Sequence, residues 1–463
     1  MDGISGAIDC IAAISTPVAQ GGVSMIRISG EDALTVAERV FVPKYPVTDI
    51  KQMGGYTAAY GEIVRGGQKL DDGILTVYLQ PHSYTGENVA EITCHGGILV
   101  TRRVLNACIE AGARPAQAGE FTKRALLNGK LSLTGAEAVI DIINAESDGF
   151  IAAAKAQRDG ALHRRTERLC EKIKATAEEI TAWIDYPDEA EDETEIVTAD
   201  WAAAAKEICA DVDGLLDSFE SGKVLRDGIT AAIVGKPNAG KSTLMNLLSG
   251  TDTSIVTDIE GTTRDIVEET VNVGDIRLRL ADCAGLRETG NEVEKIGVEK
   301  MMARLETARL IIAVFDGSRP LSEEDKRLIG LIAGKTVLPI INKSDLEEKL
   351  DIAYVTARLG EPLTMSAKHG EGLQQLESAI TELCGIKHLD PAEGFIANDR
   401  QRDCVLRAKN HTDAAYNALS AGMTVDAAGA ELEAALSCLY ELDGREAGEE
   451  IIDGVFKRFC VGK

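Results

Sequence analysis

Residues 229–248 read Ile-Thr-Ala-Ala-Ile-Val-Gly-Lys-Pro-Asn-Ala-Gly-Lys-Ser-Thr-Leu-Met-Asn-Leu-Leu, and this stretch decides the fold. The apolar, β-rich run Ile229–Val234 predicts a buried strand, and the pattern Gly-x-x-x-x-Gly-Lys-Ser at 235–242 follows it directly. A helical segment comes next. Strand, glycine-rich turn and helix in this order are typical of a phosphate-binding loop, whose backbone N–H groups surround phosphate oxygens. We expect Lys241 to reach the β- and γ-phosphates and the Ser242 hydroxyl to ligate Mg²⁺.

Further β-rich runs alternate with amphipathic segments after this loop. They cover Ile276–Leu280, Leu310–Phe315 and Val337–Ile341. Such alternation predicts βαβ units around a parallel sheet.

Asn342-Lys343-Ser344-Asp345 stands at the carboxyl end of the last of these runs. A carboxylate there can accept hydrogen bonds from N1–H and the 2-amino group of guanine, which adenine cannot supply. We assign this role to Asp345. Ser366-Ala367-Lys368 fits a loop that packs on the base. The sequence therefore predicts a guanine-nucleotide site.

Two segments between the phosphate loop and residue 310 complete the predicted site. The first begins at Thr257 and lies where the first switch loop of GTPases belongs, with Thr263 as the second Mg²⁺ hydroxyl. The second begins at Asp282, which can hold Mg²⁺ through water, while the Gly285 N–H can meet the γ-phosphate. The predicted GTP-binding residues are Asn238, Ala239, Gly240, Lys241, Ser242, Thr243, Thr257, Asp258, Ile259, Glu260, Gly261, Thr262, Thr263, Asp282, Cys283, Ala284, Gly285, Asn342, Lys343, Ser344, Asp345, Ser366, Ala367 and Lys368.

The residue that orients the attacking water is harder to assign. Small signalling GTPases place a Gln after the Asp-x-x-Gly motif, but Leu286 stands at that position here and cannot hydrogen-bond. The carboxylates of Glu288, Glu292 and Glu294 follow closely, and residue types alone do not choose among them.

Composition limits the class of protein. The 463 residues suggest about three domains, and the net charge of −26 argues against a general nucleic-acid binder, which carries a basic face. No apolar run reaches the ~20 residues needed to cross a bilayer, so we expect a cytoplasmic protein without a membrane anchor. Ten cysteines lie between Cys10 and Cys460 without a C-x-x-C pair, which predicts mostly buried thiols in a reducing compartment.

Composition also divides the chain into four segments. Residues 1–130 mix strand-like runs such as Ser24–Ile28 and Gly73–Val77 with helices, and residues 131–227 are helical. The α/β segment covers 228–384, and 385–463 is helical again. We predict that the two helical segments form one discontinuous domain into which the α/β domain is inserted.

The nucleotide motifs resemble those of the MnmE (TrmE) family of tRNA-modification GTPases, and the resemblance continues outside them. It includes Gly-Gly-Val-Ser-Met-Ile-Arg-Ile-Ser-Gly at 21–30, Ser-Tyr-Thr-Gly-Glu-Asn-Val-Ala-Glu at 83–91, Gly-Glu-Phe-Thr-Lys-Arg at 119–124 and a terminal Cys-x-Gly-Lys at 460–463. The resemblance implies an N-terminal α+β domain that binds a one-carbon tetrahydrofolate (5-formyl or 5,10-methylene) and forms a homodimer. It also implies a helical domain and an inserted Ras-like P-loop GTPase domain. The implied function, with an FAD-carrying MnmG-type partner, is to add an aminomethyl-type (carboxymethylaminomethyl) group to C5 of the wobble uridine of certain tRNAs.

The same resemblance assigns roles to individual residues. It implies Glu294 as the catalytic residue that orients water, and a K⁺ site formed by Asn238, Thr257, Ile259 and Thr262. It implies folate contacts for Arg27, Glu91, Lys130 and Lys463. Cys460 is a candidate for redox or covalent chemistry near the folate.

Few positions depart from the family pattern. Cys283, Leu126 and Ala118 stand where the family usually has Thr, Phe and Pro, and none of these changes removes a charged group. An alternative hypothesis is a ribosome-assembly or translation GTPase that acts as an RNA-binding switch. Such proteins usually append a basic domain, whereas the flanks here are acidic and helical.

Overall fold

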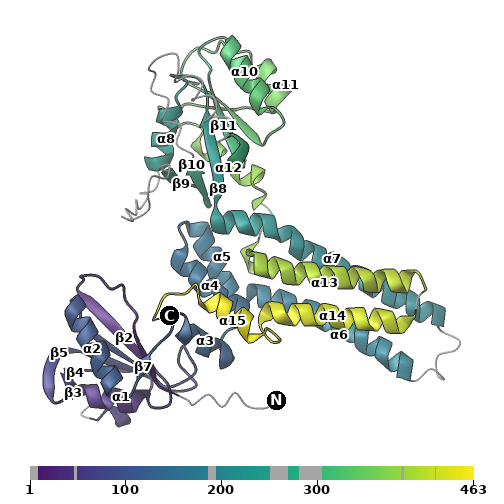
Figure 1. The fold of residues 1–463 in the computed structure, drawn as a ribbon. Helices are drawn as coiled ribbons and strands as arrows, with labels where there is room; N and C mark the ends of the chain where they lie inside the picture. The colour runs from purple at the N-terminus through teal and green to yellow at the C-terminus, as the bar shows by residue number, and fades with distance from the viewer. Residues whose placement is uncertain are drawn as a thin grey trace. The chain divides into compact units, whose positions relative to one another are not determined.

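The computed structural model describes residues 9–45, 49–185, 194–250, 269–280, 305–386, 390–422 and 424–462. The chain forms two compact units. The first unit comprises Met1–Ile140, Arg158–Glu167 and Leu436–Lys463, and the second unit comprises Asp141–Gln157 and Arg168–Ala435. Figure 1 labels the helices and strands of both units.

A seven-stranded sheet forms the core of the first unit. Its order is β3-β4-β5-β6-β2-β1-β7, and all neighbours are antiparallel except β1 and β7. The strands are β1 (Ile11–Ile14), β2 (Val23–Ser29), β3 (Phe41–Tyr45), β4 (Thr57–Arg65), β5 (Gln68–Tyr78), β6 (Val89–His95) and β7 (Arg114–Pro115). β2 and β5 contain the two strand-like runs expected from the sequence, so that prediction is confirmed.

One face of this sheet is apolar and carries two helices. Val36 of α1 (Ala33–Val40) and Val104 of α2 (Ile98–Glu110) pack in one buried cluster with Ile28, Ile63 and Leu75 of the strands. The alternation of buried and partly exposed residues along β2 follows from the strand period of two. The opposite face of the sheet is therefore free to carry polar side chains.

The C-terminus of the chain belongs to the first unit. Phe456, at the end of α15 (Glu449–Phe456), and Phe459 pack on Ala136 and Val139 of α4 (Leu133–Asn144). Beyond them the backbone N–H of Gly119 donates to the carbonyl of Cys460, just before α3 (Glu120–Leu127). The terminal motif is thus fixed against the N-terminal part of the chain.

A six-stranded sheet lies in the second unit, in the order β13-β12-β11-β8-β10-β9. All neighbours are parallel except the β9–β10 hairpin. The strands are β8 (Ile229–Val234), β9 (Glu269–Val273), β10 (Ile276–Leu280), β11 (Leu310–Asp316), β12 (Val337–Asn342) and β13 (Leu363–Met365). The four strand-like runs predicted after residue 228 are confirmed.

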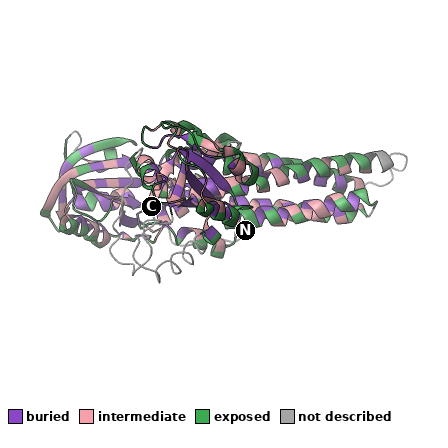
Figure 2. Cartoon of the chain, turned by 90° about the horizontal axis from the view of Figure 1, so that it is seen from above, coloured by how far each residue is buried: buried purple, intermediate pink, exposed green. Residues whose placement is uncertain are grey.

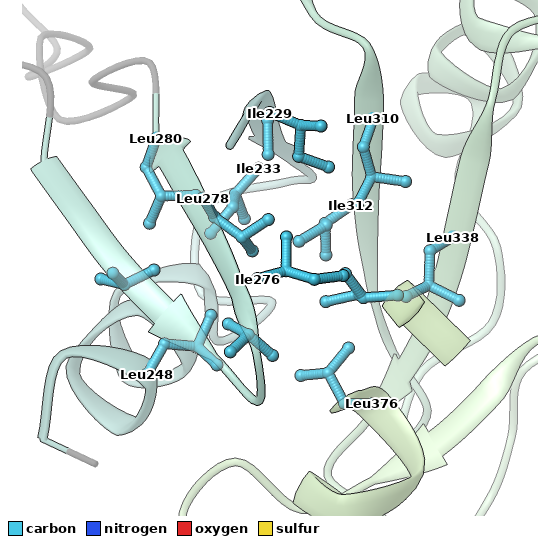
Figure 3. Packing of buried hydrophobic residues seen from close by; sticks show 14 of the residues in the cluster. Ile229, Ile233, Leu248, Ile276, Leu278, Leu280, Leu310, Ile312, Leu338 and Leu376 are labelled. Atoms are coloured by element: carbon cyan, nitrogen blue, oxygen red, sulfur yellow. The ribbon is translucent and has the colours of Figure 1, made fainter. Parts of the chain in front are cut away.

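Both faces of this sheet are buried, which explains why its strands read as continuous apolar runs. Ile233 and Ile312 point to one face, and Figure 3 shows them beside Leu278 and Ile276 of β10. Leu376 of α12 (Leu373–Leu383) belongs to the same buried cluster. Val234 and Ile311 point to the other face and pack in a separate cluster. The covering helices also include α8 (Lys241–Gly250), α10 (Glu323–Ile332) and α11 (Ile352–Leu359).

Long helices precede and follow the α/β segment. They are α5 (Asp148–Arg158), α6 (Ala161–Asp185), α7 (Thr194–Asp227), α13 (Asp399–Ser420) and α14 (Val425–Asp443). α7 and α13 pack side by side although the sheet separates them in the sequence. Figure 2 shows buried residues recurring along the long helices between exposed ones. Among the described residues, no helix is both long and apolar enough to cross a membrane.

Candidate functional site

The phosphate loop connects β8 to α8 through residues that adopt left-handed backbone conformations. Asn238 has φ +66° and Gly240 has φ +102°. A Cβ atom on Gly240 would lie 1.9 Å from Nδ2 of Asn342, and one on Gly235 would lie 2.2 Å from the carbonyl oxygen of Val314. Both glycines are therefore required by close packing of the loop against the ends of β11 and β12.

Lys241 folds its ammonium group back over this loop. Its Nζ atom donates to the carbonyls of Gly235, at 2.7 Å, and Lys236, at 2.8 Å. A cation held above a glycine-rich turn, at the N-terminus of α8, is a suitable environment for phosphate oxygens. Ser242 and Thr243 lie in the first turn of α8, where the Ser242 hydroxyl can join a Mg²⁺ ion bound to those oxygens.

Asn342 joins the phosphate loop to the predicted base-binding loop. Its Nδ2 donates to the carbonyl of Ala239 at 2.9 Å, and its Oδ1 accepts from the N–H of Ala367 at 2.9 Å. The side chain is almost fully buried, so both ends of its carboxamide are satisfied inside the protein. Three segments far apart in the sequence are thereby held at one edge of the sheet.

Asp345 lies beside this junction. Its Oδ1 accepts a 2.7 Å hydrogen bond from the hydroxyl of Ser366, which holds the pKa of the carboxyl below its usual range. An ionised, oriented carboxylate can accept the two N–H groups of guanine. Lys343 turns away from it and donates to Asp316 at 2.5 Å. Lys368 is exposed, and Ser344 donates its N–H to the carbonyl of Met365.

Several predicted site residues lie outside the described residues. They are the segment Thr257–Thr263 with its Mg²⁺ and K⁺ positions, the segment Asp282–Gly285, Leu286, the three candidate carboxylates Glu288, Glu292 and Glu294, and Lys463. The hairpin β9–β10 stands between the two switch segments in the sequence.

A second polar site lies in the first unit, on the face of the sheet opposite α1 and α2. Arg27 of β2 and Glu91 of β6 are direct cross-strand partners, and Nε of Arg27 lies 2.8 Å from Oε1 of Glu91. The hydroxyl of Tyr78 donates to Oε2 of Glu91 at 3.3 Å. The guanidinium of Arg27 lies 5.7 Å from the ring centroids of both Tyr84 and Phe121. An ion pair among aromatic rings can offer both charges to one planar polar ligand.

Lys130, another predicted folate residue, and Asn128 both contact the chain between β5 and β6. Lys130 donates to the carbonyl of Pro81 at 3.1 Å, and Asn128 donates to that of Thr85 at 2.7 Å. Cys460 is exposed, and Gly462 accepts a hydrogen bond from Ser15 at 3.0 Å. Tyr78, Tyr84 and Phe121 had not been predicted as site residues, although strand alternation would have placed Tyr78 on the face that carries Glu91.

The described cysteines and acidic groups offer little for a transition metal. Seven of the nine described cysteines are buried and Cys384 is partly buried, as predicted, which leaves Cys460 exposed. Within the described ranges, one group of potential ligands comes together, formed by His163, Glu167 and Asp443. Arg445 already forms ion pairs with both carboxylates there, so we interpret the group as an ion-pair network.

The parallel sheet, the phosphate loop and the Asn342–Asp345 loop together define a P-loop GTPase. Family models agree along the chain: the MnmE helical domain matches residues 133–460, and the N-terminus of the GTP-binding protein TrmE matches residues 10–130. The chain belongs to the MnmE (TrmE) family.

Individual relatives match almost end to end. The tRNA modification GTPase MnmE of Lactobacillus delbrueckii subsp. bulgaricus is 40% identical over 460 residues, which cover 98% of both chains. That of Thermoanaerobacter pseudethanolicus is 40% identical over 460 residues, covering 98% of this chain and 99% of its own. A solved structure of a single-residue variant of Aquifex aeolicus Era bound to GDP·AlF4⁻ matches 40% of this chain and 66% of its own, at 27% identity and a TM-score of 0.28.

Proposed function

We propose that this protein hydrolyses GTP to drive the modification of tRNA. In this proposal it adds an aminomethyl-type (carboxymethylaminomethyl) group to C5 of the wobble uridine of certain tRNAs, together with an MnmG-type partner that carries FAD. The structural observation that carries the GTPase part is the Asn342 carboxamide, which joins the phosphate loop to the loop beside Asp345. Membership of the family, in which close relatives are named as tRNA modification GTPases, supports tRNA as the substrate.

The nucleotide site supports binding of GTP with Mg²⁺. Lys241 would contact the β- and γ-phosphates, and Asp345 would accept from the guanine base. Ser242 and Thr263 would hold Mg²⁺, which would neutralise charge on the phosphate oxygens. We further propose that Glu294 orients the attacking water and that Asn238, Thr257, Ile259 and Thr262 hold K⁺. The left-handed backbone at Asn238 supports this role, because it fixes the direction in which the Asn238 side chain leaves the phosphate loop.

The first unit is proposed to bind a one-carbon tetrahydrofolate. The pair of Arg27 and Glu91 matches the chemistry of the ligand, because a pterin offers N–H donors to a carboxylate and a folate tail offers carboxylates to cations. Lys130 and Lys463 are the proposed cations for that tail, and Cys460 is a proposed redox or covalent residue. We also propose a homodimer formed through the first unit, and a place in the cytoplasm with the tRNA.

The test combines two measurements on the full-length protein. GTP turnover is measured in KCl and in NaCl at equal ionic strength, and modified uridine is measured by mass spectrometry after reaction with the FAD-carrying partner. We expect strong activation by K⁺ and modification that requires GTP, tRNA and a tetrahydrofolate. Equal, slow turnover in both salts with unmodified tRNA would instead favour an RNA-binding switch.

A further inference from the structure

The hairpin β9–β10 lies at an unusual point of the chain. It directly follows the segment predicted as the first switch and directly precedes the segment predicted as the second. Any change of nucleotide state that moves either segment therefore acts on a strand of this hairpin. Its apolar residues, such as Ile276, pack inside the second unit, so it moves only with its neighbours.

The neighbours of the hairpin include the junction between α4 and α5. The Nδ2 atom of Asn272 donates to the carbonyl of Glu146 at 2.7 Å, and Nη2 of Arg277 lies 2.5 Å from Oε2 of the same residue. Phe150, in the first turn of α5, is buried in the cluster that contains Val273 and Ile276. Polar contacts on one side and apolar contacts on the other thus bind the junction to the hairpin.

The closest approach is between Gly149 and the turn of the hairpin. A Cβ atom on Gly149 would lie 2.3 Å from Cβ of Asp275. Because a Cβ atom has no rotamer freedom, the overlap could be relieved only by moving the backbone of the helix or of the hairpin. The glycine at 149 is therefore what allows this contact.

The segment that contacts the hairpin lies between two stretches of chain that belong to the first unit. The chain leaves the first unit after Ile140, contacts the hairpin, and returns to the first unit at Arg158. The segment 141–157 is thus a loop of the first unit's own chain that is packed into the second unit. It contacts the hairpin of the nucleotide sheet through non-covalent bonds, and both of its ends continue directly into the chain of the unit that contains Arg27 and Glu91.

The contact also contains polar atoms that are poorly satisfied. Oδ1 of Asn272 and Nε of Arg277 are buried and have no hydrogen-bond partner among the described residues. Burying such atoms unpaired lowers the stability that this contact contributes.

We infer that the segment 141–157 couples the GTPase centre to the folate-containing unit, with Glu146 and Gly149 as positioning residues that act through the β9–β10 hairpin. This inference rests on the proposed function. Movement of the hairpin during the GTP cycle displaces the α4–α5 junction, and the two ends of the segment transmit that displacement to the first unit. Neither Glu146 nor Gly149 contacts the nucleotide in this scheme.

The test changes the side chains at the two residues in contact, Gly149 and Asp275, separately and together. Gly149→Ala introduces the overlap, Asp275→Gly removes the opposing Cβ, and the double variant restores the space. Gly330→Ala in α10 is the matched control, because a Cβ there meets no atom within 4 Å. For each full-length protein we would measure GDP affinity, GTP turnover in KCl, and modified uridine formed per GTP hydrolysed.

We expect Gly149→Ala to bind GDP normally but to form about fivefold less modified uridine per GTP, and we expect the double variant to recover. A ratio unchanged from wild type, or no recovery in the double variant, would overturn the inference. If Gly149→Ala fails to fold, the same measurements are made on Glu146→Ala, which should also form less modified uridine per GTP. Its control is Glu220→Ala, which removes the exposed ion pair with Arg309. A wild-type protein that does not modify tRNA would overturn the proposed function itself. If the wild-type protein modifies tRNA and both variants form as much modified uridine per GTP as it does, only this inference is overturned.

Discussion

The hydroxyl of Ser366 lies 2.7 Å from Oδ1 of Asp345, although 21 positions separate the two residues in the sequence. This hydrogen bond fixes one oxygen of the carboxylate, and the other oxygen, Oδ2, lies 3.9 Å from Nε2 of His369. The loop that carries Ser366 is itself fixed by the bond from Ala367 to Asn342. The orientation of the proposed base-reading group thus depends on two segments that only the fold brings together.

The first prediction concerns the choice of base. Asp345→Asn replaces one acceptor oxygen by an N–H₂ group, so the site should lose guanine and accept xanthine, whose 2-oxo group can receive that hydrogen bond. We expect GDP affinity to fall at least ~100-fold and XDP affinity to rise, measured by competition with a fluorescent nucleotide. Unchanged selectivity for GDP would remove Asp345 from this role. Ser366→Ala should also lower GDP affinity, but by a smaller factor than Asp345→Asn.

A second prediction concerns the stability of the second unit. Asn342→Ala leaves the carbonyl of Ala239 and the N–H of Ala367 buried without their partner. We expect the free energy of unfolding to fall by about 1–3 kcal/mol, measured by urea denaturation. Asn246→Ala, at an exposed position of α8, serves as the control and should have little effect. Equal stability of the two variants would show that the bridge contributes nothing.

Folate binding provides the third prediction. Arg27→Ala removes one half of the ion pair with Glu91 and should weaken binding of 5-formyltetrahydrofolate about tenfold or more, measured by calorimetry. GTP turnover in the absence of tRNA should stay at the wild-type rate, because Arg27 lies in the other compact unit. Arg65→Ala, which removes the exposed pair with Glu110, is the control. Equal folate affinity in the two variants would contradict the assignment.

The fourth prediction follows from an ion-pair network in the first unit. Burial raises the pKa of Glu120, but hydrogen bonds from Arg114 and from the N–H of Gln117 outweigh it and hold that pKa below its ordinary value of 4.5. A group with a lowered folded-state pKa stabilises the protein above its ordinary pKa and loses this contribution as the pH falls through the lowered value. The melting temperature of the first unit should therefore drop below about pH 4.5. The melting temperature of Glu120→Gln should fall less steeply with falling pH than that of the exposed control Glu31→Gln. Identical melting profiles of the two variants against pH would show that Glu120 does not contribute to this pH dependence.

A fifth prediction concerns hydrolysis itself. Glu294→Ala should lower GTP turnover by about 100-fold or more while leaving GDP affinity nearly unchanged, since a water-orienting carboxylate acts only in the reaction step. Single-turnover hydrolysis and nucleotide titration separate the two effects. Retained turnover would return the role to Glu288 or Glu292.

The sequence by itself was sufficient for the elements and motifs whose signals are local. The glycines of the phosphate loop, the buried runs of the parallel sheet and the helical flanks follow from backbone conformation and from the period of apolar residues, which neighbouring residues determine. The assignment of Asn342–Asp345 to a strand end was possible for the same reason. Long stretches with a strong period therefore predicted the fold class and the place of the inserted sheet.

Only the tertiary structure decided which residues meet across the chain. Strand pairing sets Arg27 against Glu91 and surrounds the pair with rings from three segments, and packing brings Asn342 onto Gly240. The division of the chain into compact units was equally unpredictable, because residues 141–157 look like any other helical stretch yet pack with the nucleotide sheet. Such contacts depend on the shape and burial of partners distant in sequence, and these are properties of the folded chain rather than of any local pattern.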